Sequence, residues 1–364
     1  MHPRVVIVGG GTGGHLFPGI AVAQEFRQRH EAEVVFLTTP KPVTIQILEK
    51  YQLPWEAVAS RAVKGMGLFA RLRAWFGVPG HVLAARDRLK KLKPHLVLGV
   101  GGHASGPVGV AAWTLGLPLV IHEQNAIPGL TNRLLGRVAG RVFLSFPDTE
   151  GHFAEDKSRW TGNPIRREFF EAAPPRPEKP FTVLVMGGSQ GAHHLNMEVL
   201  KALPLLAAHR DHLKFLHLTG DADLDQVQQS YHEAGFAAEV AAFTPEVAAW
   251  MARAHLLVCR AGAGTLAELT ARGRAALLVP YPFAANNHQE ANARFLENAG
   301  AAILILNKHF TGELLADTIL QFLAQPERLQ AMEAASLRLA KPHAAGEIVA
   351  GCLELLDKLN ITKP

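Results

Sequence analysis

The stretch RVVIVGGGTGGH, residues 4–15, joins a short run of β-branched residues directly to a glycine-rich turn. Such a run is typical of a buried strand, and the glycines after it let backbone N–H groups approach an anion. Gly9, Gly11 and Gly14 fit the GxGxxG pattern of dinucleotide-binding folds. The following strand, EVVFLTT, ends in two threonines, so the acidic residue that would bind an NAD ribose is missing. We therefore expect a phosphate-containing ligand other than NAD at this turn.

Short apolar runs alternate with longer helical patterns along the chain. Continuous apolar strands between helices predict parallel sheets that helices cover on both faces, which is the α/β class. The predicted strands are Arg4–Val8, Glu33–Leu37, Leu96–Gly99, Leu119–His122, Val142–Leu144, Phe181–Met186, Lys214–Leu218, Leu256–Cys259, Ala276–Val279 and Ala302–Leu306.

The chain of 364 residues is longer than one hydrophobic core usually serves. A second strand and glycine-rich turn, TVLVMGGSQGAH at 182–193, repeats the pattern of the first, and the Pro-rich stretch 171–180 between them is typical of a linker. These features predict two Rossmann-like, doubly wound domains that face each other across a cleft.

Four glycine-rich turns follow predicted strands, at 9–15, 99–107, 187–196 and 259–268. Ligands of doubly wound folds bind beyond the carboxyl ends of the strands, where such turns lie. Two turns in each half therefore indicate a cleft that binds phosphates on both sides. The alternative is that they are tight turns only, because glycine serves in those as well.

The bulk composition excludes several classes of protein. A net charge of +5 and a pI of about 9.3 favour anionic partners but are too mild to indicate nucleic acid. Cys259 and Cys352 form no CxxC pair, so neither a disulfide framework nor a zinc site is expected. The chain enters a strand at once, which leaves no room for a signal peptide, and no apolar run reaches the ~18 residues of a membrane span. We expect a cytoplasmic protein.

His15 begins the helix expected after the first turn. The positive end of a helix disfavours imidazolium, which lowers the pKa of a histidine there and keeps the ring neutral. A neutral imidazole is a suitable general base at pH 7, although a capping or buried structural histidine fits the position equally well. Two polar clusters, HEQN at 122–125 and NNHQEAN at 286–292, are also expected at the cleft. Glu268 follows Gly264 by one helical turn and could accept from both hydroxyls of a ribose, or be an ordinary first-turn glutamate.

The stretch GDADLD at 220–225 contains the DxD spacing that holds a divalent cation in some nucleotide-sugar enzymes. It also precedes a helical pattern, QVQQSYHEAG, at whose start aspartate is a common N-cap. We favour the capping interpretation and expect neither a metal site nor a cofactor.

The stretch RAVKGMGLFARLRAWFGVPG, residues 61–80, combines a helical apolar face with basic residues around it. Such a pattern suits a helix that lies on an anionic membrane, and a core-packing helix is the alternative. The residues expected at the membrane are Leu68, Phe69, Leu72, Trp75 and Phe76.

The quoted motifs, together with GVGGHASGPVGVAAWTLGLPLVIHEQNAIPGLTNRLL, TGNPIR and CRAGAGTLAEL, closely resemble the bacterial MurG family. The resemblance implies a metal-independent, inverting glycosyltransferase of the GT-B fold. Such an enzyme moves GlcNAc from UDP-GlcNAc to the C4 hydroxyl of MurNAc in lipid I and gives lipid II for peptidoglycan. It further implies a peripheral protein on the cytoplasmic face of the inner membrane, whose anionic surface is a partner. Another GT-B glycosyltransferase with a lipid acceptor is the alternative, and a non-catalytic binding protein is a second one.

Site residues are carried over from the family by motif. The resemblance implies that residues 1–163, joined by the C-terminal helix 341–364, bind lipid I, and that residues 164–340 bind UDP-GlcNAc. For catalysis it points to His15 as the base and Asn125 as its orienting partner. The substrate-binding residues implied on the acceptor side are Thr12, Gly13, Gly14 and Asn125. Those implied for the donor are Arg166, Ser189, Gln190, Phe243, Thr244, Ala263, Gly264, Thr265, Leu266, Glu268, His288 and Gln289.

Overall fold

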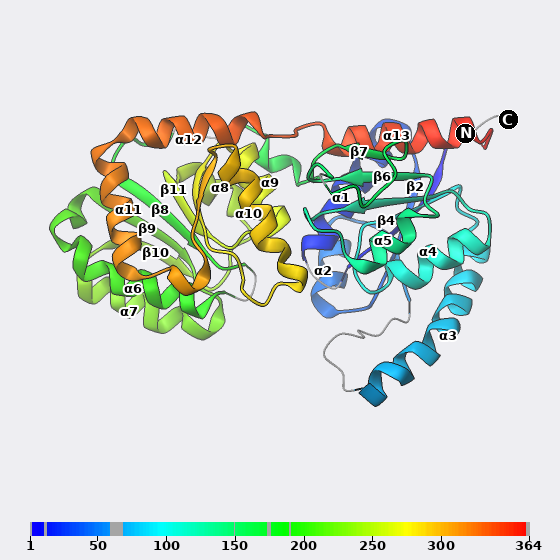
Figure 1. Ribbon diagram of the computed structural model, residues 1–364, viewed down its shortest axis with the longest axis horizontal. Coiled ribbons are helices and arrows are strands. Elements are labelled where there is room, and N and C mark those ends of the chain that lie inside the picture. Colours follow the sequence, from blue (N-terminus) through cyan, green and yellow to red (C-terminus); the bar gives the residue numbers. More distant parts are fainter. Residues whose placement is uncertain are drawn as a thin grey trace. The chain divides into compact units, whose positions relative to one another are not determined.

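The computed structural model describes residues 2–10, 13–58, 68–148, 150–172, 176–188 and 191–361, with the backbone alone over 68–78. The chain forms two compact units, each with its own parallel sheet (Figure 1). The first unit comprises Met1–Arg166 and Lys341–Pro364, and the second comprises Arg167–Ala340. The chain changes unit ahead of the Pro-rich stretch, so the prediction of a linker at 171–180 is wrong.

A parallel sheet of 7 strands forms the centre of the first unit, in the order β3-β2-β1-β4-β5-β6-β7. Its strands are β1 (Arg4–Val8), β2 (Glu33–Thr38), β3 (Trp55–Ala57), β4 (Leu96–Gly99), β5 (Leu119–Glu123), β6 (Arg141–Leu144) and β7 (Ser158–Trp160). Its helices are α1 (Gly13–His30), α2 (Pro42–Lys50), α3 (Leu68–Leu92), α4 (Ser105–Thr114), α5 (Leu130–Gly136) and α13 (Ala344–Lys358).

Both faces of this first sheet are buried. Successive residues of a strand point to opposite faces, and on β1 Val5 and Ile7 pack with α1 and α13 while Val6 and Val8 pack with α3, α4 and α5. The C-terminal helix α13 therefore completes the core of the first unit. Gly351 of α13 lies against β6, where an added Cβ would come 2.6 Å from the Phe143 ring.

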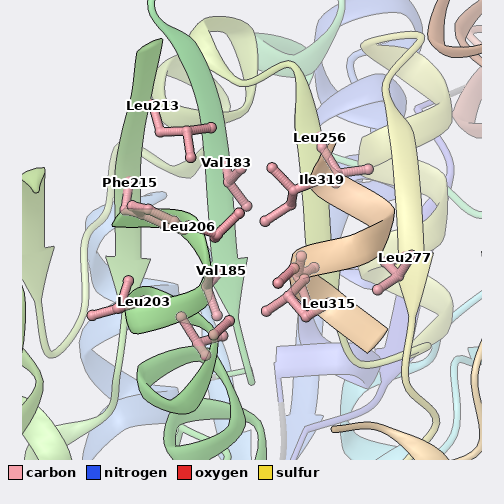
Figure 2. Packing of buried hydrophobic residues seen from close by; sticks show 14 of the residues in the cluster. Val183, Val185, Leu203, Leu206, Leu213, Phe215, Leu256, Leu277, Leu315 and Ile319 are labelled. Atoms are coloured by element: carbon pink, nitrogen blue, oxygen red, sulfur yellow. The ribbon is translucent and has the colours of Figure 1, made fainter. Parts of the chain in front are cut away.

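The second unit is built around a parallel sheet of 6 strands in the order β10-β9-β8-β11-β12-β13. Its strands are β8 (Phe181–Met186), β9 (Leu213–Leu218), β10 (Ala237–Ala241), β11 (Leu256–Cys259), β12 (Ala275–Leu278) and β13 (Ala302–Leu304). Its helices are α6 (His193–Leu206), α7 (Leu224–Ala234), α8 (Val247–Arg253), α9 (Ala263–Ala271), α10 (His288–Asn298), α11 (Gly312–Ala324) and α12 (Pro326–Arg338). Figure 2 shows Val183 and Val185 of β8 packed among side chains of α6 and α11.

The strand order reverses at the middle of each sheet. In the first unit β1 has β2 on one side and β4 on the other, and in the second β8 lies between β9 and β11. The four predicted glycine-rich turns follow β1, β4, β8 and β11, the strands on either side of these two reversals. Ligands of open α/β sheets bind at such switch points, so the topology assigns a binding edge to each unit.

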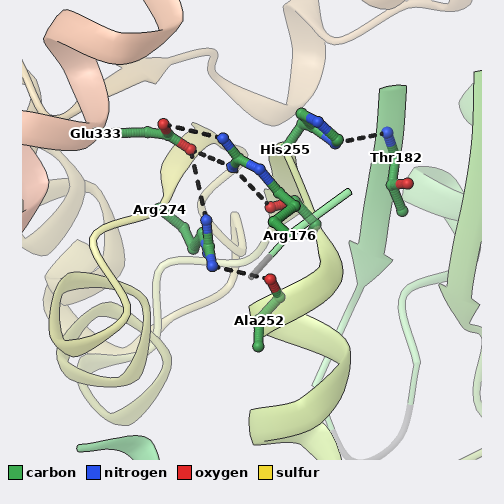
Figure 3. A network of polar contacts seen from close by, with 7 residues as sticks. Arg176, Thr182, Ala252, His255, Arg274 and Glu333 are labelled. Carbon is green, nitrogen blue, oxygen red and sulfur yellow. Dashed lines mark hydrogen bonds and ion pairs between the residues drawn. The ribbon is translucent and has the colours of Figure 1, made fainter. Parts of the chain in front are cut away.

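A polar network joins the segment that enters β8 to α12 in the second unit (Figure 3). Arg176 donates to both carboxylate oxygens of Glu333, and Arg274 lies 3.7 Å from the same carboxylate. Nearby, His255 Nδ1 accepts from the N–H of Thr182 at 2.9 Å. These contacts join segments far apart in sequence and lie away from the glycine-rich turns, which gives them a structural role.

Candidate active site

The turns after β1 and β4 touch each other in the first unit through glycine. A Cβ atom on Gly102 would lie 2.7 Å from the Gly10 carbonyl oxygen, and one on Gly101 would lie 2.6 Å from His15 Nδ1. Gly101 and Gly102 also have φ angles of +91° and +85°, which other residues rarely adopt. Only glycine therefore lets these turns pack against each other and against His15.

His15, in the first turn of α1, is connected to the end of β5. Its Nδ1 lies 3.1 Å from Gln124 Oε1. Burial is the largest influence on the ring and lowers its pKa below the usual 6.5, whereas the bond to Gln124 and the Glu123 carboxylate oppose this shift. The sequence predicts the direction correctly, but burial rather than the helix terminus is the main cause. His15 is therefore neutral at pH 7.

Glu123, the last residue of β5, organises the loop that carries Asn125. Its carboxylate is only 3% exposed and accepts from the N–H of Asn125 at 3.0 Å, the N–H of Gly129 at 3.1 Å and Asn132 Nδ2 at 2.8 Å. A buried carboxylate is tolerated when it accepts several hydrogen bonds of this kind. Glu123 belongs to the polar HEQN cluster at 122–125, but the sequence does not show that its carboxylate holds this loop.

Two residues of the TGNPIR motif lie near this region in the first unit. The Arg166 guanidinium carbon lies 4.8 Å from the centre of the Phe17 ring on α1, within the range of a cation–π contact. Asn163 is 5% exposed, and neither polar atom of its amide has a hydrogen-bond partner among the described residues. A buried amide without a partner costs about 1–3 kcal/mol, so Asn163 is a candidate site residue that the sequence did not reveal.

The turn after β11 leads into α9 in the second unit. No described atom lies within 4 Å of a Cβ built on Gly264, so the backbone is open to a ligand there. Ala263 and Leu266 are 7% and 1% exposed, so their side chains belong to the core and only their backbone groups could meet a ligand. Thr265 and Glu268, on the same helix, are half-buried.

Gln289 forms hydrogen bonds with two loops of the second unit and so links them. Its Oε1 accepts from the N–H groups of Ala261, after β11, and Tyr281, after β12, at 3.2 and 2.9 Å. Its neighbour His288 is half-buried, with Nδ1 2.7 Å from the Ala285 carbonyl oxygen. The amide oxygen of Gln289 thus has a structural function that the sequence did not indicate.

Phe243 and Thr244 follow β10 and differ sharply in exposure. Phe243 is 65% exposed, whereas Thr244 is 8% exposed and its hydroxyl accepts from the N–H of Glu246 at 3.1 Å. The Thr244 side chain therefore shapes the loop, and the Phe243 ring is accessible.

Asp223 does not cap α7 as predicted. It stands at the N-cap, yet its side chain accepts no capping hydrogen bond from the described helix. Its carboxylate instead lies 2.8 Å from His193 Nδ1 and accepts from Asn196 Nδ2 at 2.7 Å. Asn196 Oδ1 in turn lies 3.0 Å from His217 Nε2. The capping interpretation is wrong because the carboxylate pairs with two side chains of α6 instead.

Several predicted residues lie outside the described part of the chain. These are Thr12, Ser189 and Gln190, and the side chains of Leu68, Phe69, Leu72, Trp75 and Phe76. Gly13 and Gly14 begin α1 and are exposed, and Asn125 is half-buried.

The first unit also exposes apolar side chains that the sequence did not single out. Val110 and Trp113 of α4 are 37% and 55% exposed, and Leu130 and Leu134 of α5 are 67% and 49% exposed. The helices α4 and α5 contact each other, and α4 also contacts α3. Among the described residues, no helix combines the length and apolar character needed to cross a membrane.

Comparison with known proteins matches both halves of the chain to one family. Residues 5–144 match the glycosyltransferase family 28 N-terminal domain, and residues 182–348 match the family 28 C-terminal domain. A solved structure of MurG from Acinetobacter baumannii is similar with a TM-score of 0.79 and 32% identity, covering 97% of this chain and 99% of that one.

Curated relatives match almost the whole chain. A protein of Anaeromyxobacter sp. (strain Fw109-5) is 46% identical, covering 98% of this chain and 94% of its own length. One from Myxococcus xanthus is 44% identical, with 97% and 93% covered. Both are named UDP-N-acetylglucosamine--N-acetylmuramyl-(pentapeptide) pyrophosphoryl-undecaprenol N-acetylglucosamine transferase. The two parallel sheets are therefore those of a GT-B glycosyltransferase, and the chain belongs to the MurG family.

Proposed function

We propose that this protein transfers GlcNAc from UDP-GlcNAc to the C4 hydroxyl of MurNAc in lipid I, undecaprenyl-diphospho-MurNAc-pentapeptide, and so forms lipid II for peptidoglycan. The observation that carries the proposal is the whole-length relationship to transferases named for this reaction. The glycine-rich turns at both switch points supply the phosphate-binding edges that such substrates need.

The second unit binds the donor in this proposal. The open backbone at Gly264 and the N-terminus of α9 suit the diphosphate, because helix N-termini favour anions. Glu268 accepts hydrogen bonds from the ribose hydroxyls, and the backbone groups of Phe243 and Thr244 bind uracil. His288 and Gln289 contact the GlcNAc hydroxyls. Since the Gln289 oxygen already accepts two backbone hydrogen bonds, its NH₂ group is the part assigned to the sugar.

The first unit binds the acceptor and supplies the base. The acceptor oxygen attacks the anomeric carbon while the bond to the UDP phosphate oxygen breaks, which inverts that centre. The hydroxyl proton passes to His15, whose low pKa keeps it neutral and ready to accept. Asn125, held by Glu123, orients the hydroxyl. No metal is required in this scheme, because helix N-termini stabilise the departing diphosphate.

A donor-by-acceptor assay tests the proposal. Purified protein should release UDP from UDP-GlcNAc only when a lipid I analogue is present, and UDP-Glc and UDP-GalNAc serve as control donors. Activity should survive EDTA. Binding of UDP-GlcNAc without UDP release would favour a binding protein, and transfer to diacylglycerol instead of the analogue would favour the other lipid-acceptor glycosyltransferase.

We propose further that the first unit docks peripherally on the anionic inner surface of the plasma membrane, where the acceptor lipid resides. The predicted membrane residues lie on α3, and Trp113 and Leu134 are exposed on the adjoining pair of helices. Exposed apolar side chains grouped on one unit are typical of an interaction surface. Basic residues beside them would add about 1 kcal/mol each near anionic lipid.

Two pairs of substitutions test this docking surface. Trp75→Glu with Phe76→Glu, and separately Trp113→Glu with Leu134→Glu, should each lower sedimentation with phosphatidylglycerol vesicles and leave UDP-GlcNAc binding intact. Higher salt should also weaken vesicle binding, because ions screen the basic residues. Leu205→Glu with Leu337→Glu is the matched control, since these leucines are exposed on the second unit. If both first-unit pairs fold and bind vesicles like the parent, the membrane surface lies elsewhere.

A further inference from the structure

A chain of hydrogen-bonding groups runs from His15 into the interior of the first unit. His15 Nδ1 lies 3.1 Å from Gln124 Oε1, and Gln124 Nε2 lies 2.9 Å from His122 Nδ1. On its far side, His122 Nε2 lies 3.3 Å from both the Gly162 carbonyl oxygen and Ser145 Oγ. Gln124 is 2% exposed and His122 is fully buried. Such groups are costly to bury unless they are paired, so their arrangement is tightly determined.

The orientation of the Gln124 amide follows from its neighbours. Its nitrogen faces two backbone carbonyl oxygens, that of Val100 at 2.9 Å and that of His122 at 3.2 Å. A carbonyl oxygen only accepts, so it requires the NH₂ end of the amide. A flipped amide would place its own oxygen against both carbonyls. The oxygen of Gln124 therefore points at His15, and the sheet backbone holds it there.

This orientation determines where the proton of His15 lies. An amide oxygen has no hydrogen to give, so the His15 nitrogen that faces it must be the donor. In a neutral imidazole one nitrogen carries the proton and the other carries the lone pair. With the proton on Nδ1, the lone pair is on Nε2.

His122 has the complementary arrangement. The Gln124 NH₂ group has two hydrogens, and its two shortest contacts, at 2.9 Å each, are with the Val100 carbonyl oxygen and His122 Nδ1. His122 Nδ1 therefore accepts, and the proton of the neutral ring is on Nε2, which faces the Gly162 carbonyl oxygen. Burial lowers the pKa of His122 to about 4, so the ring is neutral at pH 7. His122 thus reinforces the amide orientation without competing for the His15 proton.

We propose that Gln124 is a positioning residue that holds His15 in its Nδ1–H tautomer, which leaves Nε2 to accept a proton. The catalytic part of this inference rests on the proposed function, in which His15 is the base. The tautomer itself does not, because it follows from the hydrogen bonds alone. A neutral amide suits this purpose, since a carboxylate in its place would favour a charged ring.

Nitrogen-15 NMR of the full-length protein tests the tautomer directly. At pH 7.5 the His15 ring should show a protonated Nδ1 and an unprotonated Nε2, assigned by comparison with His15→Gln. An unprotonated Nδ1 in the parent protein would overturn the proposal, and this measurement needs no substitution at Gln124.

Gln124→Leu and Gln124→Met remove the acceptor while keeping a side chain of similar size. Each should shift His15 toward the Nε2–H tautomer or a mixture, and Ser145→Ala is the matched control. That substitution removes a hydroxyl from the same network on the far side of His122, and it should leave the His15 signals unchanged. An unaltered tautomer in a folded Gln124 variant would overturn the proposal.

Kinetics separate this inference from the proposed function. If His15 is the base, the Gln124 variants should lower kcat by roughly tenfold, the effect of about one buried hydrogen bond, with KM for UDP-GlcNAc unchanged. The pH profile is a second readout. The hydrogen bond to Gln124 raises the pKa of His15, so its loss should move the acidic limb of the profile to lower pH. The other groups that act on His15, namely Glu123, the Val100 backbone, His103 and His122, are not altered. A changed tautomer with unchanged kcat would support the role of Gln124 and refute His15 as the base.

Discussion

At the scale of single residues, adjacent residues of the HEQN segment at the end of β5 have different roles. Glu123 holds the loop that follows, whereas Gln124 points back toward His15. The sequence identifies the cluster, because four polar residues at the end of an apolar strand are unusual for a core. It does not distinguish their tasks, which depend on which backbone groups face each side chain.

Glu268 carries the first prediction. Glu268→Ala should weaken UDP-GlcNAc binding by roughly 1.5–3 kcal/mol, because a charged acceptor of the ribose hydroxyls is lost. Isothermal titration calorimetry measures the change, and Glu233→Ala, an exposed glutamate of α7 in the same unit, controls for the loss of charge. Unchanged affinity for the donor would remove Glu268 from the site.

At the scale of elements, the strands that the sequence missed are all at sheet edges. The sequence predicted ten strands and missed β3, β7 and β10, each of which ends a sheet. Interior strands are covered on both faces and are therefore continuously apolar. The residues of β3 and β10 are instead half-buried or exposed, so no apolar run marks them. Ser158–Trp160 of β7 is similar.

The loop between β9 and α7 gives a prediction at this scale. Asp223→Asn places an NH₂ group where the carboxylate accepts from Asn196 and faces His193. It should lower the free energy of unfolding by about 1–3 kcal/mol, since a buried donor or acceptor loses its partner. Urea denaturation measures the loss. Asp225→Asn, exposed in the same GDADLD segment, should be nearly silent, and equal effects of the two substitutions would contradict a specific role for Asp223.

At the scale of the whole molecule, histidines buried in a neutral form link stability to pH. Burial lowers the pKa of His122 in the first unit to about 4 and that of His217 in the second to about 3. The unfolded chain binds protons at these positions below pH ~6.5 while the folded protein does not. Stability should therefore fall as the pH falls from about 6.5 toward these values.

Measuring the free energy of unfolding at pH 7 and at pH 5 tests whether stability falls as the pH is lowered. Each of these two histidines should contribute a loss on the order of 2 kcal/mol over that interval. Most carboxylates titrate below it, so they contribute little. Stability that stays constant or rises toward pH 5 would show that these rings are not held neutral in the folded protein.

The sequence by itself determined the class of fold, the interior strands and the four glycine-rich turns. These follow from local patterns, because burial on both faces and close approach to a phosphate each restrict residue type over a few positions. The long motifs also sufficed to indicate the family, and the comparisons confirm it.

Only the tertiary structure decided how the polar residues are used. The partners of Asp223 and of Gln124 depend on segments distant in the chain. A buried hydrogen bond joins whichever donors and acceptors the fold brings together. Local sequence constrains the residue type at such a position, but the chain must fold before the partner is defined.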